Sequence, residues 1–173
     1  MNRAFISLGS NIDKEANMPA AVRMLQELCF LVAISTVYET LPMGLPDQPN
    51  FFNLAVLVET TLQPGELKSQ VLDYIEETLE RVRMPDRNAP RTIDVDLTLF
   101  NEEVLDYNGH HIPDPDLLRF AHVAVPIADI APALHHPETG EQMASIAARL
   151  SARAAKKYGV QVLWPRPDVD LLG

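Results

Sequence analysis

The segment from residue 92 to residue 100 alternates apolar and polar side chains, the pattern of a β-strand with one buried face. Side chains two residues apart on a strand point the same way, so Asp94 and Asp96 are expected to share the polar face. Paired carboxylates of this kind can bind a divalent cation. The alternating positions are Ile93, Val95, Leu97 and Leu99 on the apolar face and Asp94, Asp96 and Thr98 on the polar face.

A segment rich in arginine precedes this strand. It contains Arg81, Arg83, Arg87 and Arg91 with one acid, Asp86, so its net charge is 4 − 1 = +3 in a chain whose formal net charge is −10. Guanidinium groups bind phosphate oxygens in a bidentate fashion. The first two arginines could instead complement the carboxyl end of a helix, whereas the last two fall in a loop bracketed by prolines that could cover an anionic ligand. Together with the aspartates, the segment predicts metal-assisted chemistry on a polyphosphate.

Length and composition predict one catalytic domain over residues 1–173, with a core over about 1–150 and a C-terminal extension over 151–173. The chain contains no run of about 18 apolar residues that could span a bilayer, and its first residues lack the pattern of a secretory signal. We therefore expect a cytoplasmic protein, working as a monomer. The negative charge argues against nucleic acid or an anionic membrane as a partner. The single cysteine, Cys29, excludes an intramolecular disulfide and is expected to be a structural thiol.

Periodicity and turn residues predict the order strand, helix, strand, strand, helix, strand. This order is typical of an α+β, ferredoxin-like βαββαβ domain with an antiparallel sheet and both helices on one face. The expected strands are 4–9, 32–38, 51–61 and 92–100, and the expected helices begin near 16 and 64. After residue 100 we expect a hairpin around 101–103, helical additions near 121–130 and 142–157, and a late strand at 160–164.

Three further segments contain candidate binding residues. A loop rich in proline and glycine, 40–50, precedes Phe51 and Asn53, an aromatic ring and an amide that could stack on and hydrogen-bond a flat heterocycle, although adjacent phenylalanines are often core residues. Gly-Ser-Asn at 9–11 lacks the spacing of a phosphate-binding loop and is interpreted as a structural turn. Among the histidines, which form no zinc motif, His122 is the pocket candidate.

These residues lie in strings that resemble the 6-hydroxymethyl-7,8-dihydropterin pyrophosphokinase family of the folate pathway. The strings are Ile-Ser-Leu-Gly-Ser-Asn, Val-Tyr-Glu-Thr-Leu-Pro-Met-Gly, Asp-Gln-Pro-Asn-Phe-Phe-Asn, Arg-Val-Arg, Ala-Pro-Arg-Thr-Ile-Asp-Val-Asp-Leu-Thr-Leu-Phe and Ile-Ala-Pro, and they extend to about residue 150. The resemblance implies a ferredoxin-like core and transfer of pyrophosphate from ATP to the hydroxymethyl group of the pterin, with release of AMP. It also implies two Mg²⁺ ions as cofactors.

The resemblance further implies a role for individual residues. Asp94 and Asp96 match the carboxylates that bind the two metal ions. The catalytic group implied is Arg81, Arg91, Asp94 and Asp96. The ATP contacts implied are Glu76, Arg81, Arg83, Arg91 and Arg119. The pterin contacts implied are Thr40, the backbone near Met43, Phe51, Asn53 and His122.

The chain departs from the family pattern around the expected pocket. Asn88 and Ala89 replace a common Trp-Gly, and Asp114 replaces a histidine. Phe120 replaces a common arginine, for which the adjacent Arg119 is the expected substitute. One alternative is therefore a catalytically weakened paralogue that binds a pterin or a nucleotide. A nucleotidyltransferase, which also combines Gly-Ser with Asp-x-Asp, is disfavoured because the two motifs lie far apart in this chain.

Overall fold

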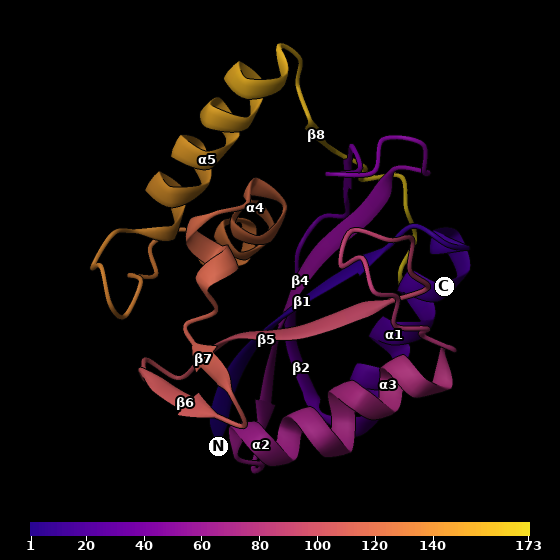
Figure 1. Cartoon of the computed structure of the whole chain (residues 1–173). Coiled ribbons are helices and arrows are strands. Elements are labelled where there is room, and N and C mark those ends of the chain that lie inside the picture. Colours follow the sequence, from indigo (N-terminus) through magenta and orange to yellow (C-terminus); the bar gives the residue numbers. More distant parts are fainter.

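The computed structural model describes all residues from 1 to 173 and has a six-stranded sheet at its centre (Figure 1). The strand order is β5-β1-β4-β3-β8, with β2 also pairing with β4, and every neighbouring pair is antiparallel. The strands are β1 (Asn2–Ser10), β2 (Phe30–Ile34), β3 (Tyr38–Thr40), β4 (Phe51–Thr60), β5 (Asp94–Phe100) and β8 (Leu163–Pro165). A separate hairpin consists of β6 (Leu105–Tyr107) and β7 (His110–Ile112).

The helices complete the predicted ferredoxin-like order. The first core helix is α1 (Lys14–Leu28), and the second runs through α2 (Pro64–Leu67), a π-helical turn η1 (Lys68–Leu72) and α3 (Asp73–Thr78). Three later elements follow β7: a short 3₁₀ helix η2 (Pro115–Leu118), α4 (Ala121–Ile130) and α5 (Met143–Tyr158). None of these helices combines the length and the apolar character needed to cross a bilayer. The α+β class with C-terminal helical additions is thus confirmed.

The two faces of the sheet bury separate apolar clusters. Ile6 and Leu8 on β1 pack with α1 and the second core helix, whereas Phe5 packs with α4 and α5. This division follows from the alternation of side chains along a strand. Burial of each large apolar side chain contributes about 1.5–3 kcal/mol relative to exposure. Both core helices therefore lie on one face, as predicted, and the C-terminal helices cover part of the other (Figure 1). Cys29 is half-buried beside the first cluster, and burial raises the pKa of its thiol.

The expected strand at 32–38 is in fact two strands, β2 and β3. Between them, Ser35 donates its backbone N–H to the Ala55 carbonyl (2.9 Å), while its hydroxyl oxygen accepts from the Ala55 N–H (2.9 Å). A side chain thus takes the place of a backbone acceptor, and the ladder is interrupted there. The prediction of one continuous strand was wrong because its β-branched residues do not reveal this local hydrogen bond.

The alternation predicted for 92–100 also breaks near its end. Phe5 pairs with Leu99 but the next residue, Ile6, pairs with Leu97, so Thr98 is an extra residue opposite β1. The Thr98 hydroxyl donates to the Phe5 carbonyl (2.9 Å). This bulge turns Leu99 toward α4 and α5 while Leu97 stays on the α1 face.

The expected hairpin around 101–103 lies further along the chain. A turn follows Phe100, but the hairpin tip is Asn108-Gly109, between β6 and β7. Both tip residues have positive φ, 47° and 79°. Asn-Gly is the preferred pair for such two-residue turns because both residues tolerate this conformation.

Candidate active site

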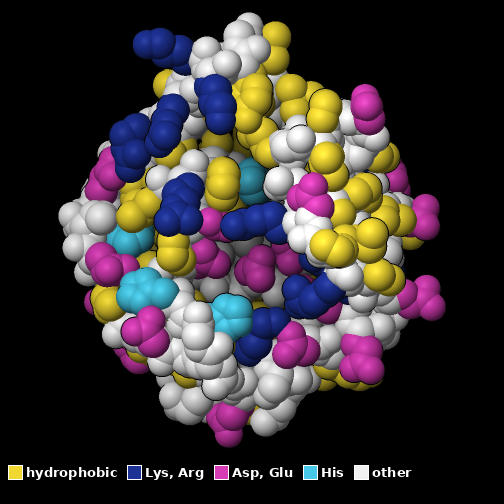
Figure 2. All heavy atoms as spheres, in the orientation of Figure 1, with side chains coloured by type: hydrophobic (Ala, Val, Ile, Leu, Met, Phe, Trp, Pro, Cys, Tyr) yellow, Lys and Arg dark blue, Asp and Glu magenta, His cyan; other side chains and the backbone are white.

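A cavity of about 370 Å³ lies on the sheet face that carries α4 and α5. Its floor comes from β1, β4 and β5, and its walls come from the segments 40–43 and 81–91 and from the start of α4. Figure 2 shows a hollow in this face with acidic side chains at the bottom and Lys or Arg side chains around it. Anionic and cationic groups therefore meet in one cavity.

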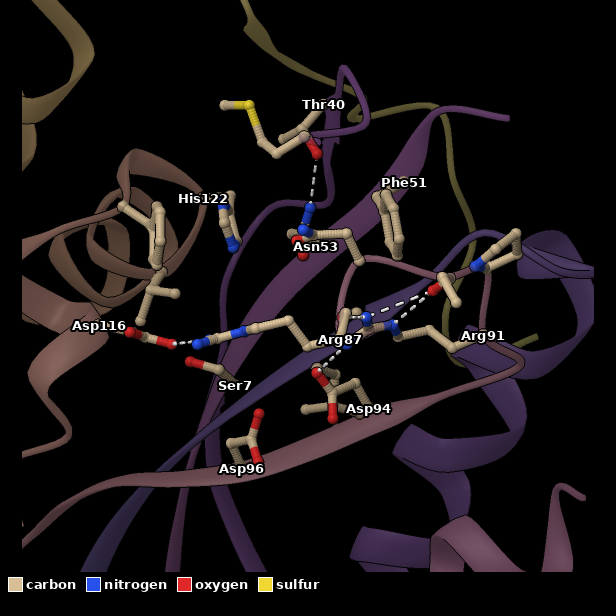
Figure 3. A pocket seen from close by; sticks show the side chains of 18 of the residues that line it. Ser7, Thr40, Phe51, Asn53, Arg87, Arg91, Asp94, Asp96, Asp116 and His122 are labelled. Atoms are coloured by element: carbon tan, nitrogen blue, oxygen red, sulfur yellow. Dashed lines mark hydrogen bonds and ion pairs between the residues drawn. The ribbon is translucent and has the colours of Figure 1, made fainter. Parts of the chain in front are cut away.

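The alternation of side chains brings four residues of two adjacent strands to the cavity floor. Asp94 and Asp96 on β5 both line the cavity, as do Gly9 and Ser7 on β1. The strand register places Asp94 opposite Gly9 and Asp96 opposite Ser7. The two carboxylates predicted to share a face thus rise from one strand toward one cavity (Figure 3).

The two aspartates differ in their surroundings. Asp94 forms ion pairs with Arg91 (3.0 Å) and Arg81 (3.3 Å). The Asp96 carboxylate has no hydrogen-bond or ion-pair partner, and its pKa is raised well above its ordinary value by burial and then by the charges of Asp94, Asp114 and Glu76. Carboxylate oxygens are the ligands that Mg²⁺ prefers, and a cation would relieve this repulsion. The donor set on β5 fits a divalent cation.

The four arginines of the segment 81–91 divide into two pairs by exposure. The side chains of Arg81 and Arg91 are only 10% and 15% exposed, whereas those of Arg83 and Arg87 are 67% and 78% exposed. Arg81 Nη1 donates to the carbonyl of Ile93 (2.7 Å). The inner pair is therefore held beside the carboxylates, and the outer pair lies on the rim.

The backbone of Arg91 is fixed by the turn that follows β1. The Arg91 N–H donates to Asn11 Oδ1 (2.8 Å), and the Arg91 carbonyl accepts from the N–H groups of Asn11 and Ile12 (both 3.1 Å). The Ser10 hydroxyl donates to the Thr92 carbonyl (2.5 Å). These contacts give the Gly-Ser-Asn turn the structural role interpreted from its sequence.

Glu76, which the resemblance assigns to ATP, lies outside the residues that line the cavity. It is 4% exposed, and its carboxylate accepts from the Val95 N–H (3.0 Å) and from Arg83 Nη2 (2.8 Å). Burial raises the pKa of Glu76, and the hydrogen bond from Val95 and the charge of Arg83 oppose this rise. Glu76 therefore supports β5 at the residue between the two aspartates.

The opposite side of the cavity carries the residues expected to bind a pterin. Thr40, Met43, Phe51, Asn53 and His122 all line it. Asn53 Nδ2 donates to Thr40 Oγ1 (2.7 Å), and both residues are buried. A Cβ atom at position 9 would lie 2.9 Å from Asn53 Oδ1, so glycine there leaves room for the amide. Figure 3 shows Phe51, Asn53 and His122 around the same space.

His122 lies against Phe120, with ring centroids 5.3 Å apart and an interplanar angle of 24°. Burial lowers the pKa of His122 to about 4, and the nearby charges of Asp116 and Asp94 only partly oppose this. The imidazole is therefore neutral near pH 7. A neutral ring in this place gives the cavity a flat wall without adding charge.

The two loops above the cavity contact each other through Asn88, where the resemblance implies a tryptophan. Gln48 Nε2 donates to the Asn88 carbonyl (2.8 Å). Gly44 has a φ of +83°, and a Cβ atom on it would lie 2.5 Å from Asn88 Nδ2. A small polar side chain packed on a glycine thus joins the two loops.

The segment before α4 differs most from the resemblance. Arg119, expected to contact ATP, does not line the cavity; its exposed side chain lies 3.9 Å from Asp116, which also pairs with Arg87 across the cavity (3.7 Å). Asp114 does not line the cavity either. Its carboxylate accepts a hydrogen bond from the Asp116 N–H (2.9 Å) and so caps η2. Burial raises the pKa of Asp114.

Several lining residues were not predicted as site residues from the sequence, and two of them, Ser7 and Asp116, carry polar groups close to the predicted ones. The Ser7 hydroxyl is buried without a hydrogen-bond partner, next to Asp96 in register. The alternation of the first strand could have placed Ser7 on the face of Gly9, but only the pairing of β1 with β5 brings it to Asp96. Nothing in the local sequence indicates that Asp116 approaches Arg87.

Comparison with known proteins identifies relatives over most of the chain. Residues 5–132 match the model of the family 7,8-dihydro-6-hydroxymethylpterin-pyrophosphokinase (HPPK). The chain is 39% identical to the 2-amino-4-hydroxy-6-hydroxymethyldihydropteridine pyrophosphokinase of Bacillus subtilis over 132 residues, 75% of this chain and 78% of that protein. It is 37% identical to the protein of the same name from Pseudomonas aeruginosa, over 80% of this chain and 86% of that protein. It spans only 19% of the folic acid synthesis protein of Pneumocystis carinii, with 35% identity.

Solved structures share the fold at low sequence identity. A crystal structure of HPPK-DHPS in complex with substrates superposes with a TM-score of 0.74 at 13% identity, covering 95% of this chain and 48% of that one. Wild-type Plasmodium falciparum HPPK-DHPS with pteroate gives a TM-score of 0.70 at 15% identity, covering 92% of this chain and 44% of that one. These chains are thus more than twice as long as the part they share with this one. This likeness shows the fold, and the sequence matches over most of the chain show that it belongs to the HPPK family.

Proposed function

We propose that this chain transfers pyrophosphate from ATP to the hydroxymethyl group of 6-hydroxymethyl-7,8-dihydropterin, releasing AMP, as a step of folate biosynthesis. One observation carries the proposal: the aspartates of β5 lie in one cavity between buried arginines and a pocket with aromatic and amide groups. The names of the bacterial relatives support the same reaction.

The half of the cavity near β3 and β4 suits the pterin. A pterin is flat and has hydrogen-bond donors and acceptors along its edge. Asn53 and Thr40 offer an amide and a hydroxyl to that edge, and Phe51 and His122 offer faces for stacking. The backbone near Met43 completes this half. Since His122 is neutral, it adds no charge next to the pterin.

The half near β5 suits the triphosphate. Arg81 and Arg91 are paired with Asp94 in the free protein. Phosphate oxygens compete for the same guanidinium donors, so binding of ATP would draw the arginines away and leave the carboxylate free for a cation. Arg83 and Arg87, at the rim, are the contacts for the outer phosphates. In this proposal Glu76 acts indirectly, by supporting β5, and Arg119 acts through Asp116.

The proposal includes two Mg²⁺ ions bound by Asp94 and Asp96. When bound, such ions lower the pKa of the attacking hydroxyl and neutralise charge that develops on the phosphates. The chain's own residues fix the geometry: Asn53 and the stacking rings orient the hydroxymethyl group, and Arg81 and Arg91 hold the triphosphate for in-line attack on the β-phosphorus. This orientation turns a reaction between two substrates into one within a single complex.

Product analysis distinguishes the proposal from its alternatives. ATP, Mg²⁺ and the hydroxymethylpterin should give AMP and pyrophosphorylated pterin in equal amounts. A weakened paralogue, favoured by the apolar Phe120 and the acidic Asp116 on the cavity wall, would bind the pterin without forming AMP. A nucleotidyltransferase would release pyrophosphate instead. The matched control is the double variant Asp94→Asn, Asp96→Asn, which keeps the side-chain shapes and should form no AMP.

The proposal extends to the working form of the protein. We propose that residues 1–173 act as one catalytic domain, as a monomer in the cytoplasm, on small-molecule substrates alone. Light scattering after size exclusion should give a single species near 19.3 kDa with and without substrates. A dimer that persists at the concentrations of the activity assay would contradict the monomer.

A further inference from the structure

The residues after α5 return to the central sheet and add a strand to it. Figure 1 shows this segment, in yellow, running from α5 across one end of the sheet to the C-terminus near α1. In β8, Trp164 pairs with Glu39 of β3 and Leu163 pairs with Thr40. The Leu41 N–H donates to the carbonyl of Val162 (3.0 Å). All these C-terminal residues lie outside the segment 5–132 that matches the family model.

A cluster of charged and aromatic side chains holds this added strand. Glu39 Oε2 accepts from Arg166 Nη1 (2.8 Å) and from Trp164 Nε1 (3.2 Å). Glu39 Oε1 lies 3.5 Å from Lys14 Nζ, at the start of α1. The Glu39 side chain is only 16% exposed, so these contacts are partly shielded from water. Arg166 and Lys14 also lie over the ring of Phe52, at 5.5 and 4.8 Å from its centroid.

The cluster is ionised in the folded protein. Burial alone would raise the pKa of Glu39, but the hydrogen bond from Arg166 and the charges of Lys14 and Arg166 lower it. Charge-assisted hydrogen bonds are stronger than neutral ones, particularly where water is partly excluded. Arg166 is the charged donor, beside the Trp164 indole, that connects the C-terminal segment to this carboxylate.

The cluster lies directly behind the pterin half of the cavity. Successive residues of a strand point to opposite faces, so Glu39 faces the cluster while Thr40 faces the cavity. Thr40 Oγ1 is the acceptor for Asn53 Nδ2 (2.7 Å). Because β3 has only three residues, its position depends on its neighbours, β4 on one side and β8 on the other. Contacts made to Glu39 therefore fix the direction of Thr40.

We propose that residues 162–166 are a positioning element for the pterin, in which Arg166 and Trp164 act through Glu39 to hold Thr40 and Asn53 in place. This inference rests on the proposed function, since it names the ligand of that pocket. The phosphate half is not part of the effect, because two strands, β1 and β4, separate β3 from β5. The C-terminal strand thus sets affinity for the pterin separately from affinity for ATP.

The test compares Arg166→Ala with Arg166→Lys and Trp164→Phe. Calorimetry measures the Kd for the hydroxymethylpterin and, separately, for a non-hydrolysable ATP analogue with Mg²⁺, and steady-state kinetics gives both KM values and kcat. Arg166→Ala should raise the Kd and KM for the pterin about five- to tenfold, with the ATP values and kcat within about twofold of wild type. Trp164→Phe keeps an aromatic ring without the N–H donor and should give a smaller rise, and Arg166→Lys should recover part of the loss.

The control is Arg149→Ala, which removes the same charge from the surface of α5, where Arg149 pairs with Glu141 (2.8 Å). It should change neither Kd. An equal rise in the pterin and ATP constants for Arg166→Ala, or no rise in the pterin Kd for either Arg166→Ala or Trp164→Phe, would overturn the inference. A wild-type protein that binds the pterin but forms no AMP would instead overturn the proposed function, and the calorimetric comparison would still decide the inference.

Discussion

Arg91 Nη1 lies 3.0 Å from Asp94 Oδ2, so the group expected to bind phosphate neutralises the group expected to bind metal. Arg91 also donates to the carbonyls of Arg87 and Ala89 within its own loop. One guanidinium therefore connects the loop over the cavity to the strand beneath it (Figure 3). In the free protein Arg91 and Arg81 therefore neutralise Asp94, and the substrates must separate these ion pairs, whereas Asp96 is left without a partner.

Arg91→Ala should slow the chemical step far more than it weakens pterin binding. Removal of one group that stabilises transition-state charge costs about 10²–10³-fold in rate. The expected pterin contacts lie on β3, β4, α4 and the loop after β3, so the pterin Kd should change little. Single-turnover measurements of AMP formation, beside calorimetry with the pterin, check both parts. Arg153→Ala on α5 is a control of equal charge, and a single-turnover rate equal to wild type would refute the assigned role.

Asp96→Asn should abolish most activity and yet stabilise the metal-free protein. The raised pKa of Asp96 means that its ionised form is disfavoured on folding, first by burial and then by Asp94. Since the folded state binds this proton more tightly than the unfolded state does, wild-type stability falls as pH rises through the native pKa. The variant lacks this loss, so its free energy of unfolding should exceed that of wild type at pH 8 in EDTA by about 1–2 kcal/mol.

Urea unfolding at several pH values checks this prediction. The difference between Asp96→Asn and wild type should shrink as pH falls toward about 4, near the ordinary pKa of an aspartate. Mg²⁺ at millimolar concentration should stabilise wild type but not the variant. A variant that is less stable than wild type at pH 8 would contradict the buried repulsion on which the metal site is argued.

His122 should stay neutral through the physiological range. Its pKa is lowered to about 4 by burial, against about 6.5 for an unperturbed histidine. The unfolded state therefore binds the proton more tightly between these values, and His122 makes the protein less stable as pH falls through this window. The pterin Kd should be constant between pH 6 and 8 and should rise below about pH 5.

NMR titration of the imidazole signals checks the histidine prediction. His111 serves as the internal contrast, because its hydrogen bonds with Asp106 and Glu138 raise its pKa. The variant His122→Phe keeps a flat ring, should bind the pterin, and should remove the acid-dependent loss of stability in that window. Titration of His122 near pH 6.5 would show that the ring is solvated and that the stacking wall is misplaced.

The order of elements and the common face of Asp94 and Asp96 could be predicted from the sequence, because both follow from local periodicity. Interruptions that depend on a distant partner could not. Ser35 divides an apparently continuous strand because its hydroxyl binds the backbone of Ala55, and the bulge at Thr98 exists only in the pairing with β1. The periodicity of a segment depends on that segment alone, whereas the register of a strand depends on the partner strand as well.

The site shows the same division. Loop composition and the resemblance led to Thr40, Phe51 and Asn53, and all three line the cavity. The position of a charged residue in the sequence did not predict its contacts where several charged groups compete for one partner. Glu76 binds the backbone of β5 instead of facing the cavity, and Arg119 pairs with Asp116. These outcomes depend on tertiary electrostatics, which no local pattern contains.

Ser7→Ala, on the cavity floor, should lower kcat/KM without lowering the stability of the protein. The Ser7 hydroxyl is buried without a partner beside Asp96, and a buried unsatisfied polar group costs about 1–3 kcal/mol. Since Ser7 lines the cavity, we expect a bound substrate or its solvent to supply the missing hydrogen bond. The variant should therefore be as stable as wild type or up to about 1 kcal/mol more stable, while kcat/KM falls about three- to tenfold.

Ser69→Ala, which removes an exposed hydroxyl bonded to the Gly65 carbonyl (3.0 Å), is the control and should leave kcat/KM unchanged. Urea unfolding and AMP formation, measured on the same preparations, test both variants. A Ser7→Ala protein that loses stability but keeps full kcat/KM would show that the hydroxyl stabilises the fold and does not contact the substrates.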